Sequence, residues 1–98
     1  MGGVRQIRVV DSDFDEVDRT LRAVIGDTLG LPAAQVAGFD EATPLFGTLP
    51  ELDSMAVASL LTALEERFAM LIEDDDVAAE DFATYGTLLA FARRKALR

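Results

Sequence analysis

The sequence of 98 residues contains neither cysteine nor histidine. Without cysteine, the chain can have no disulfide framework, no thiolate nucleophile and no cysteine-ligated metal. Without histidine, it lacks the commonest general base and the commonest transition-metal ligand. No paired-carboxylate or nucleophile–base spacing stands out among the remaining residues. We therefore expect a protein that is not itself an enzyme and has no metal site.

Long hydrophobic runs are also missing. Half of the residues are apolar, but no run approaches the roughly 18–20 apolar residues that a membrane span needs. The N-terminal residues lack the apolar stretch of a signal peptide. We expect one cytoplasmic domain over residues 1–98, with a folded core at about 13–92 and no membrane span.

Basic residues are few and unevenly placed. Nine Lys and Arg stand against 18 Asp and Glu, for a formal net charge of −9. Arg93, Arg94, Lys95 and Arg98 crowd the C-terminal end, where they complement the negative end of a last helix. An acidic surface repels nucleic-acid phosphates and suits basic protein partners, although charge can also serve solubility alone. We expect no nucleic-acid binding.

Three segments show the 3.6-residue apolar repeat of an amphipathic helix, at about residues 13–29, 54–68 and 87–96. The residues on these helix faces are Phe14, Val17, Leu21, Val24, Ile25 and the polar Thr28 in the first, Val57, Leu60, Leu61, Leu64 and Phe68 in the second, and Leu88, Leu89, Phe91 and Ala92 in the last. A short helical piece is predicted near residues 78–82, and Gly86 is predicted to separate or kink the last helix. No convincing strand alternation is present. The prediction is an all-α, small four-helix bundle with three longer helices and one short third helix.

The acidic residues have local roles too. Asp18 and Arg22 lie four residues apart on the first helix, the spacing of a stabilising ion pair. The run Glu73-Asp74-Asp75-Asp76 is interpreted as a solvated loop, with a weak divalent-cation site as the less favoured alternative.

The connection between the first two long helices, residues 30–53, is interrupted by proline and glycine and forms a long loop. A connection of this length is unusual unless it has a function or packs on itself. We expect apolar anchors to hold it to the core: Leu31, Val36, Phe39, Leu45, Phe46 and Leu49.

Ser54 is the first residue of the second long predicted helix, with Asp53 before it as a candidate N-cap. A negative group on this hydroxyl would lie where unpaired backbone N–H groups and the helix dipole favour negative charge. By itself, an Asp-Ser pair before a helix is more often a cap than a modification site. The surrounding pattern must therefore decide between the two.

That pattern resembles the acyl carrier protein family. Leu52-Asp53-Ser54-Met55 is similar to the family's Leu-x-Asp-Ser-Leu-type motif at the start of the second helix, and Glu65-Glu66-Arg67-Phe68 ends that helix in the family's manner. The likeness covers roughly residues 13–92 and includes the long loop and the short third helix in family order. The resemblance implies the same four-helix bundle.

The resemblance also implies a function. A phosphopantetheinyl transferase (holo-synthase) would attach 4′-phosphopantetheine from coenzyme A to Ser54. The arm would hold acyl intermediates as thioesters and present them to acyl-loading and acyl-transferring enzymes of a fatty acid, polyketide or specialised lipid- or polysaccharide-linked pathway. Asp53 matches the family's acidic neighbour, and Met55 stands where the family usually has Leu and would enter an apolar pocket of a partner.

Further residues follow from the same resemblance. Implied partner-binding residues are Glu51, Val57, Glu65 and Glu66. The implied acyl pocket consists of Leu45, Phe46, Leu60, Leu61 and Leu64, each of which can instead simply fill the core. We expect the carrier to be a monomer.

Ala56, Ala58 and Ser59 depart from the more acidic pattern of fatty-acid-synthesis carriers. Residues 45–55 are instead similar to stand-alone carriers associated with bacterial exopolysaccharide and exosortase systems. Two alternatives remain open. One is a peptidyl or aminoacyl carrier domain, although Glu51-Leu52 replaces the Gly-Gly typical of that branch. The other is an unmodified helical adaptor domain.

Overall fold

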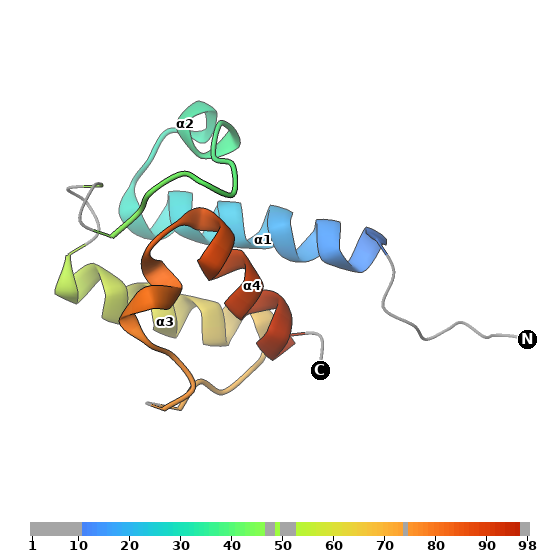
Figure 1. Cartoon of the computed structure of the whole chain (residues 1–98), viewed down its shortest axis with the longest axis vertical. Coiled ribbons are helices and arrows are strands. Elements are labelled where there is room, and N and C mark those ends of the chain that lie inside the picture. The colour runs from blue at the N-terminus through green and yellow to red at the C-terminus, as the bar shows by residue number, and fades with distance from the viewer. Residues whose placement is uncertain (1–10, 47–48, 50–52, 74, 97–98) are drawn as a thin grey trace, which may run out of the picture.

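The computed structural model describes residues 11–46, 49, 53–73 and 75–96. Three long helices dominate it: α1 (Asp11–Leu29), α3 (Ser54–Phe68) and α4 (Tyr85–Ala96) (Figure 1). Two short elements complete it, α2 (Ala33–Ala37) and the 3-10 helix η1 (Ala79–Phe82). Within these ranges, the only extended pairing is an isolated bridge between Pro44 and Thr84. The prediction of an all-α bundle is confirmed, and none of the described helices is long and apolar enough to cross a membrane.

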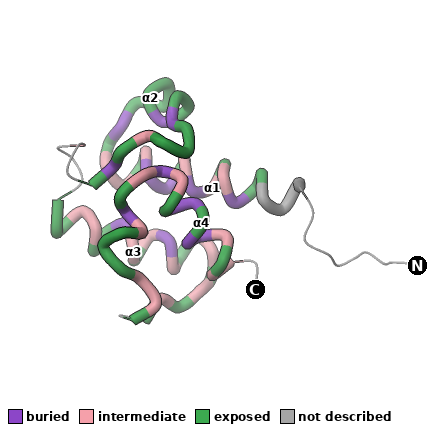
Figure 2. The backbone as a smooth tube through the Cα atoms, in the orientation of Figure 1, coloured by how far each residue is buried: buried purple, intermediate pink, exposed green. Residues whose placement is uncertain are grey.

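The bundle is organised around α1, which packs against α2, α3 and α4, while η1 packs on α4. Figure 1 shows α1 crossing the middle of the molecule between α2 and α3. The interior that these helices share is apolar, and no polar or charged residue of the described ranges is fully buried. Figure 2 shows buried positions on α1, α3 and α4, whereas most of α2 is exposed.

The predicted apolar faces form this core. The fully buried members are Val17, Leu21, Val24 and Ile25 on α1, Leu60 and Leu64 on α3, and Leu88, Leu89, Phe91 and Ala92 on α4. Val57, Leu61 and Phe68 of α3 are only partly buried, as is Thr28 of α1. The side chain of Phe14 lies outside the described part of the chain. The first half of α3 is therefore less well covered than its apolar sequence predicts.

The long loop is held by the anchors that the sequence suggested, with one correction. Leu31, Phe39 and Leu45 are buried, as is Val36 within α2, a short helix that the sequence did not predict. Phe46 is 47% exposed and does not anchor the loop in the core. The N–H groups of Leu45 and Phe46 donate to the carbonyls of Ala83 and Phe82, each at 3.0 Å. The chain turns at Phe46, so its backbone is held against residues 82–83 while its side chain stays exposed.

The prediction that Gly86 separates or kinks the last helix was wrong. α4 begins at Tyr85 and includes Gly86 in its first turn. The N–H of Gly86 donates to the carbonyl of Glu41 at 3.1 Å, and a Cβ on residue 86 would lie 2.7 Å from that oxygen. Glycine is required here because the loop backbone passes directly against α4.

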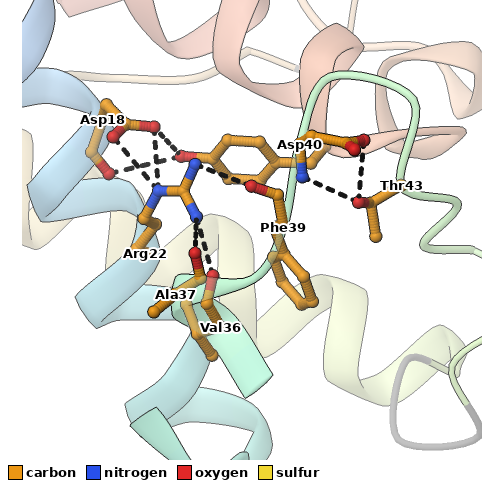
Figure 3. Close-up of polar contacts among 8 residues, drawn as sticks. Asp18, Arg22, Val36, Ala37, Phe39, Asp40 and Thr43 are labelled. Atoms are coloured by element: carbon orange, nitrogen blue, oxygen red, sulfur yellow. Dashed lines mark hydrogen bonds and ion pairs between the residues drawn. The ribbon is translucent and has the colours of Figure 1, made fainter. Parts of the chain in front are cut away.

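Arg22 joins α1 to the loop and to α4. Its Nε donates to Asp18 Oδ1 at 3.0 Å, which confirms the expected ion pair. Its Nη1 donates to the carbonyl of Val36 at 2.7 Å and its Nη2 to that of Phe39 at 3.0 Å (Figure 3). The guanidinium also lies over the ring of Tyr85, 4.6 Å from its centroid. One side chain thus connects three parts of the fold.

Tyr85, the one tyrosine of the sequence, is buried at the start of α4, and its hydroxyl donates to Asp18 Oδ1. Burial raises the pKa of Tyr85, and the hydrogen bond and negative charge of Asp18 raise this pKa further, because all three favour the neutral phenol. A raised folded-state pKa gives a stabilisation that is complete below the unfolded-state pKa of about 10. It is lost as the pH rises from there toward the folded-state pKa.

We therefore expect the free energy of unfolding to fall above a pH of about 10, by up to about 1.4 kcal/mol per pH unit from this group. Tyr85→Phe should show a shallower fall over the same range. Urea unfolding of both proteins at several pH values measures the difference, and tyrosinate absorbance reports Tyr85 alone. Parallel curves for the two proteins would contradict the assignment.

Candidate functional site

Ser54 is exposed at the N-terminal end of α3. The residue before it, Asp53, has an extended backbone, and its Oδ1 accepts the N–H of Ala56 at 2.8 Å. The predicted N-cap is therefore confirmed. The cap fixes where the helix starts, and so it fixes Ser54 as the first helical residue.

The start of α3 leaves backbone donors free next to Ser54. The carbonyl of Asp53 accepts the N–H of Val57 at 2.9 Å, which closes the first helical turn. The N–H groups of Ser54 and Met55 have no intrahelical acceptor, as at any helix start. The first turn contains no acidic residue, and α3 carries no charged side chain before Glu65. The site therefore suits one phosphodiester, whose negative charge would meet free donors and the positive end of the helix dipole.

A cavity of about 280 Å³ lies beside Ser54, between α3 and the segment that contains η1. Apart from Ser54, its lining is apolar. The lining residues are Phe46, Ser54, Val57, Leu61, Val77, Ala78, Ala79 and Phe82. The hydroxyl of Ser54 thus lies at an apolar hollow that continues along the poorly covered half of α3.

The structure divides the residues of the expected acyl pocket into two groups. Phe46 and Leu61 line the cavity. Leu45, Leu60 and Leu64 are at most 1% exposed and belong to the core. Val57, expected as a partner contact, lines the cavity as well. Sequence reasoning missed the opposite wall, from Val77 to Phe82, because periodicity within one helix does not tell which element faces it.

The residues expected to meet partner proteins also lie in different environments. Met55 is 81% exposed next to Ser54, and Glu66 is exposed near the other end of α3. Glu65 turns back instead: its Oε2 accepts the N–H of Ile72 at 2.8 Å and helps to close the end of α3. Glu51 lies outside the described residues. Among the residues that the structure describes, no group of three or more His, Cys, Asp or Glu could hold a metal ion.

Comparison with known proteins identifies the family of the chain. Residues 19–94 match the family model for the phosphopantetheine attachment site. The chain is also similar to a solved holo acyl carrier protein from Nitrosomonas europaea, with 36% sequence identity and a TM-score of 0.74. The alignment covers 85% of this chain and 98% of that one. A search of curated proteins found no match.

The fold and these matches define a carrier domain with a phosphopantetheine attachment site. The chain belongs to the acyl carrier protein family, whose cofactor is covalently attached 4′-phosphopantetheine. An exposed serine at a helix start, with donors and no acid in the first turn, fits that group.

Proposed function

We propose that Ser54 is the attachment residue and that the protein is a non-catalytic carrier of acyl groups. The observation that carries the proposal is the position of Ser54. Within the matched region, this exposed hydroxyl starts α3 and lies at the mouth of an apolar cavity. The chain itself offers no thiol and no imidazole for chemistry.

Each residue of the site has a separate task. The hydroxyl of Ser54 would attack the pyrophosphate of coenzyme A in the transferase, lose its proton and form the phosphodiester to the arm, while the pyrophosphate bond breaks and adenosine 3′,5′-bisphosphate leaves. The cap made by Asp53 holds the first turn rigid, and its exposed carboxylate lies where a transferase can use it to position the donor. The bound arm supplies the thiol that holds the acyl group as a thioester, on a tether that raises its concentration at partner sites.

The cavity supports a further part of this proposal, which is that it shelters the acyl chain. Each buried methylene contributes about 0.8 kcal/mol, so an apolar hollow beside the attachment point favours a chain inside it. We expect an octanoyl group to move the NMR signals of Val57, Leu61, Val77 and Phe82. An acetyl group, which is too short to enter, is the control. If octanoylation moved only the signals of residues 53–56, the chain would lie outside the cavity.

The proposed partners are a phosphopantetheinyl transferase and the enzymes that load and remove acyl groups, and the proposed form is a cytoplasmic monomer. Exposed Ala58, Ser59 and Thr62 give the middle of α3 a surface without acids. This neutral surface favours a specialised lipid- or polysaccharide-linked pathway over housekeeping fatty acid synthesis. The mass of the protein isolated from its own cells would identify the cargo, including an aminoacyl group if the chain serves a peptide pathway.

The experiment that tests the proposal is loading of the apo-protein. Incubation with coenzyme A, Mg²⁺ and a broad-range phosphopantetheinyl transferase should add the mass of one arm. Fragmentation of the modified peptide should locate the added mass on Ser54. If the folded protein gained no mass, or if the arm lay on another residue, the proposal would be overturned.

A further inference from the structure

The cavity wall opposite α3 runs from Val77 to Phe82 and is held at both ends, and residues 77–79 are its N-terminal part. At its C-terminal end, Phe82 is buried, and the carbonyls of Phe82 and Ala83 accept the N–H groups of Phe46 and Leu45. This end is therefore fixed to the loop and, through η1, to α4. Figure 1 shows this segment in orange, where the chain returns from the connection after α3 and leads into η1.

The N-terminal end of the wall is held by an ion pair. Asp76 precedes Val77 directly, and its Oδ2 accepts a hydrogen bond from Lys95 Nζ at 2.8 Å. The same oxygen accepts the N–H of Glu73, also at 2.8 Å. The Lys95 side chain, in the last turn of α4, is only 9% exposed. The sequence suggested that Asp76 belongs to a solvated acidic loop, but Asp76 is paired with Lys95. Lys95 therefore does more than complement the end of its helix.

Apart from the ion pair, the wall is held by Val77, which packs against the core and is partly buried, and by local hydrogen bonds. Within it, the N–H of Ala78 donates to Asp81 Oδ2, a bond internal to the η1 segment. The side chains that share the cavity across from it, Val57 and Leu61, are apolar and only partly buried. Apolar contacts set no fixed separation, whereas a shielded ion pair resists breaking because each charge would be left without its partner. The position of residues 77–79 therefore depends on residue 76.

From this geometry we propose that the Lys95–Asp76 pair is a latch that sets the distance of the cavity wall from α3. Releasing the latch frees residues 77–79 while Phe82 stays fixed, so the cavity widens at the end away from Phe82. The consequence for cargo, which rests on the proposed carrier function, is that the pair limits the length of acyl chain that the cavity shelters. Lys95 and Asp76 act as positioning residues, because neither lines the cavity.

The first test uses the apo-protein and needs no prosthetic arm. Lys95→Met removes the latch. Arg94→Met removes one positive charge from the neighbouring, exposed position and serves as the matched control. Amide hydrogen exchange should accelerate about tenfold or more at Glu73, Asp76 and Ala78 in Lys95→Met, because the N–H groups of these residues are hydrogen-bonded within the segment, with little change in α1. The control should exchange like the wild type.

A second variant distinguishes loosening of the wall from destabilisation of the whole fold. Asp76→Asn keeps the shape of the side chain and keeps Lys95 in place, and it should accelerate exchange at the same three amides. If exchange in both variants accelerated evenly over α1, α3 and the wall, the pair would stabilise the whole fold and the latch would be disproved. Unchanged exchange at the wall would disprove it equally.

The proposed effect on acyl-chain length is tested by a separate measurement. Holo-protein loaded with acyl groups of increasing length is treated with hydroxylamine, and the rate of thioester cleavage reports shielding. Each methylene that enters the cavity should slow cleavage by up to about fourfold. In Lys95→Met the slowing should continue to longer chains than in the wild type or Arg94→Met. If exchange at the wall accelerates but the chain length at which the slowing ends does not change, the proposed effect on acyl-chain length is disproved. If Ser54 takes up no arm, the proposed function fails while the exchange result stands.

Discussion

Ser54→Ala is expected to abolish loading by a phosphopantetheinyl transferase, to below detection by intact mass. The hydroxyl oxygen is the atom that would bond to phosphorus, and alanine offers none. The substitution should leave the helix in place because the cap is the side chain of Asp53, not that of Ser54. Alanine is also the strongest intrinsic helix former. Loss of loading would therefore report the missing hydroxyl and not a damaged fold.

Ser59→Ala is the matched control, because Ser59 is an exposed serine on the same helix. It should load at the wild-type rate. The third hydroxyl on α3 belongs to Thr62, and it donates to the carbonyl of Ala58 at 3.2 Å. Persistent loading of Ser54→Ala would show that the arm attaches elsewhere, and the proposed function would have to be withdrawn.

Arg22→Met is expected to lower the free energy of unfolding by about 3 kcal/mol, the largest loss that we predict for a residue outside the core. The substitution removes a donor from the carbonyls of Val36 and Phe39 and the partner of the Asp18 carboxylate. Hydrogen bonds from a charged donor are each worth roughly 1.5–3 kcal/mol, and methionine replaces part of the lost packing. For a domain of this size the midpoint of thermal unfolding should fall by on the order of 15 °C.

Two variants make this result specific. Arg19→Met, an exposed position on the same helix, should change the stability by less than about 0.5 kcal/mol. Arg22→Lys should recover only part of the loss, because an ammonium group cannot reproduce the planar fork that reaches two carbonyls and Asp18 together. Chemical denaturation measures all three. Equal stabilities for Arg22→Met and Arg19→Met would contradict the role of Arg22.

The sequence predicted those features that depend on local chemistry. The cap at Asp53 and the start of α3 at Ser54 follow from residue preferences at helix ends. The buried faces of α1 and α4 follow from apolar residues at helical spacing. The position of the candidate residue Ser54 was therefore predictable, because one short motif contains the hydroxyl, the cap and the first turn.

Features that depend on two distant segments were not predictable in the same way. The cavity joins α3 to residues 77–82, and the Lys95–Asp76 pair joins residues 19 positions apart. Gly86 was read as a helix breaker because its actual constraint, the carbonyl of Glu41, belongs to another segment. Glu65 was assigned to the surface because nothing local reveals its bond to the N–H of Ile72. Each of these features depends on which segments lie close together in the folded chain.

The thioether of Met55 stands almost wholly in water, directly after the proposed attachment residue. Methionine is unbranched, polarisable and free to turn about three side-chain bonds, so it adapts to differently shaped apolar recesses. A branched side chain at this position would favour one shape over the others. Under the proposed function, a carrier meets several enzymes whose binding surfaces differ in shape, and an adaptable side chain at residue 55 would allow one protein to contact each of them.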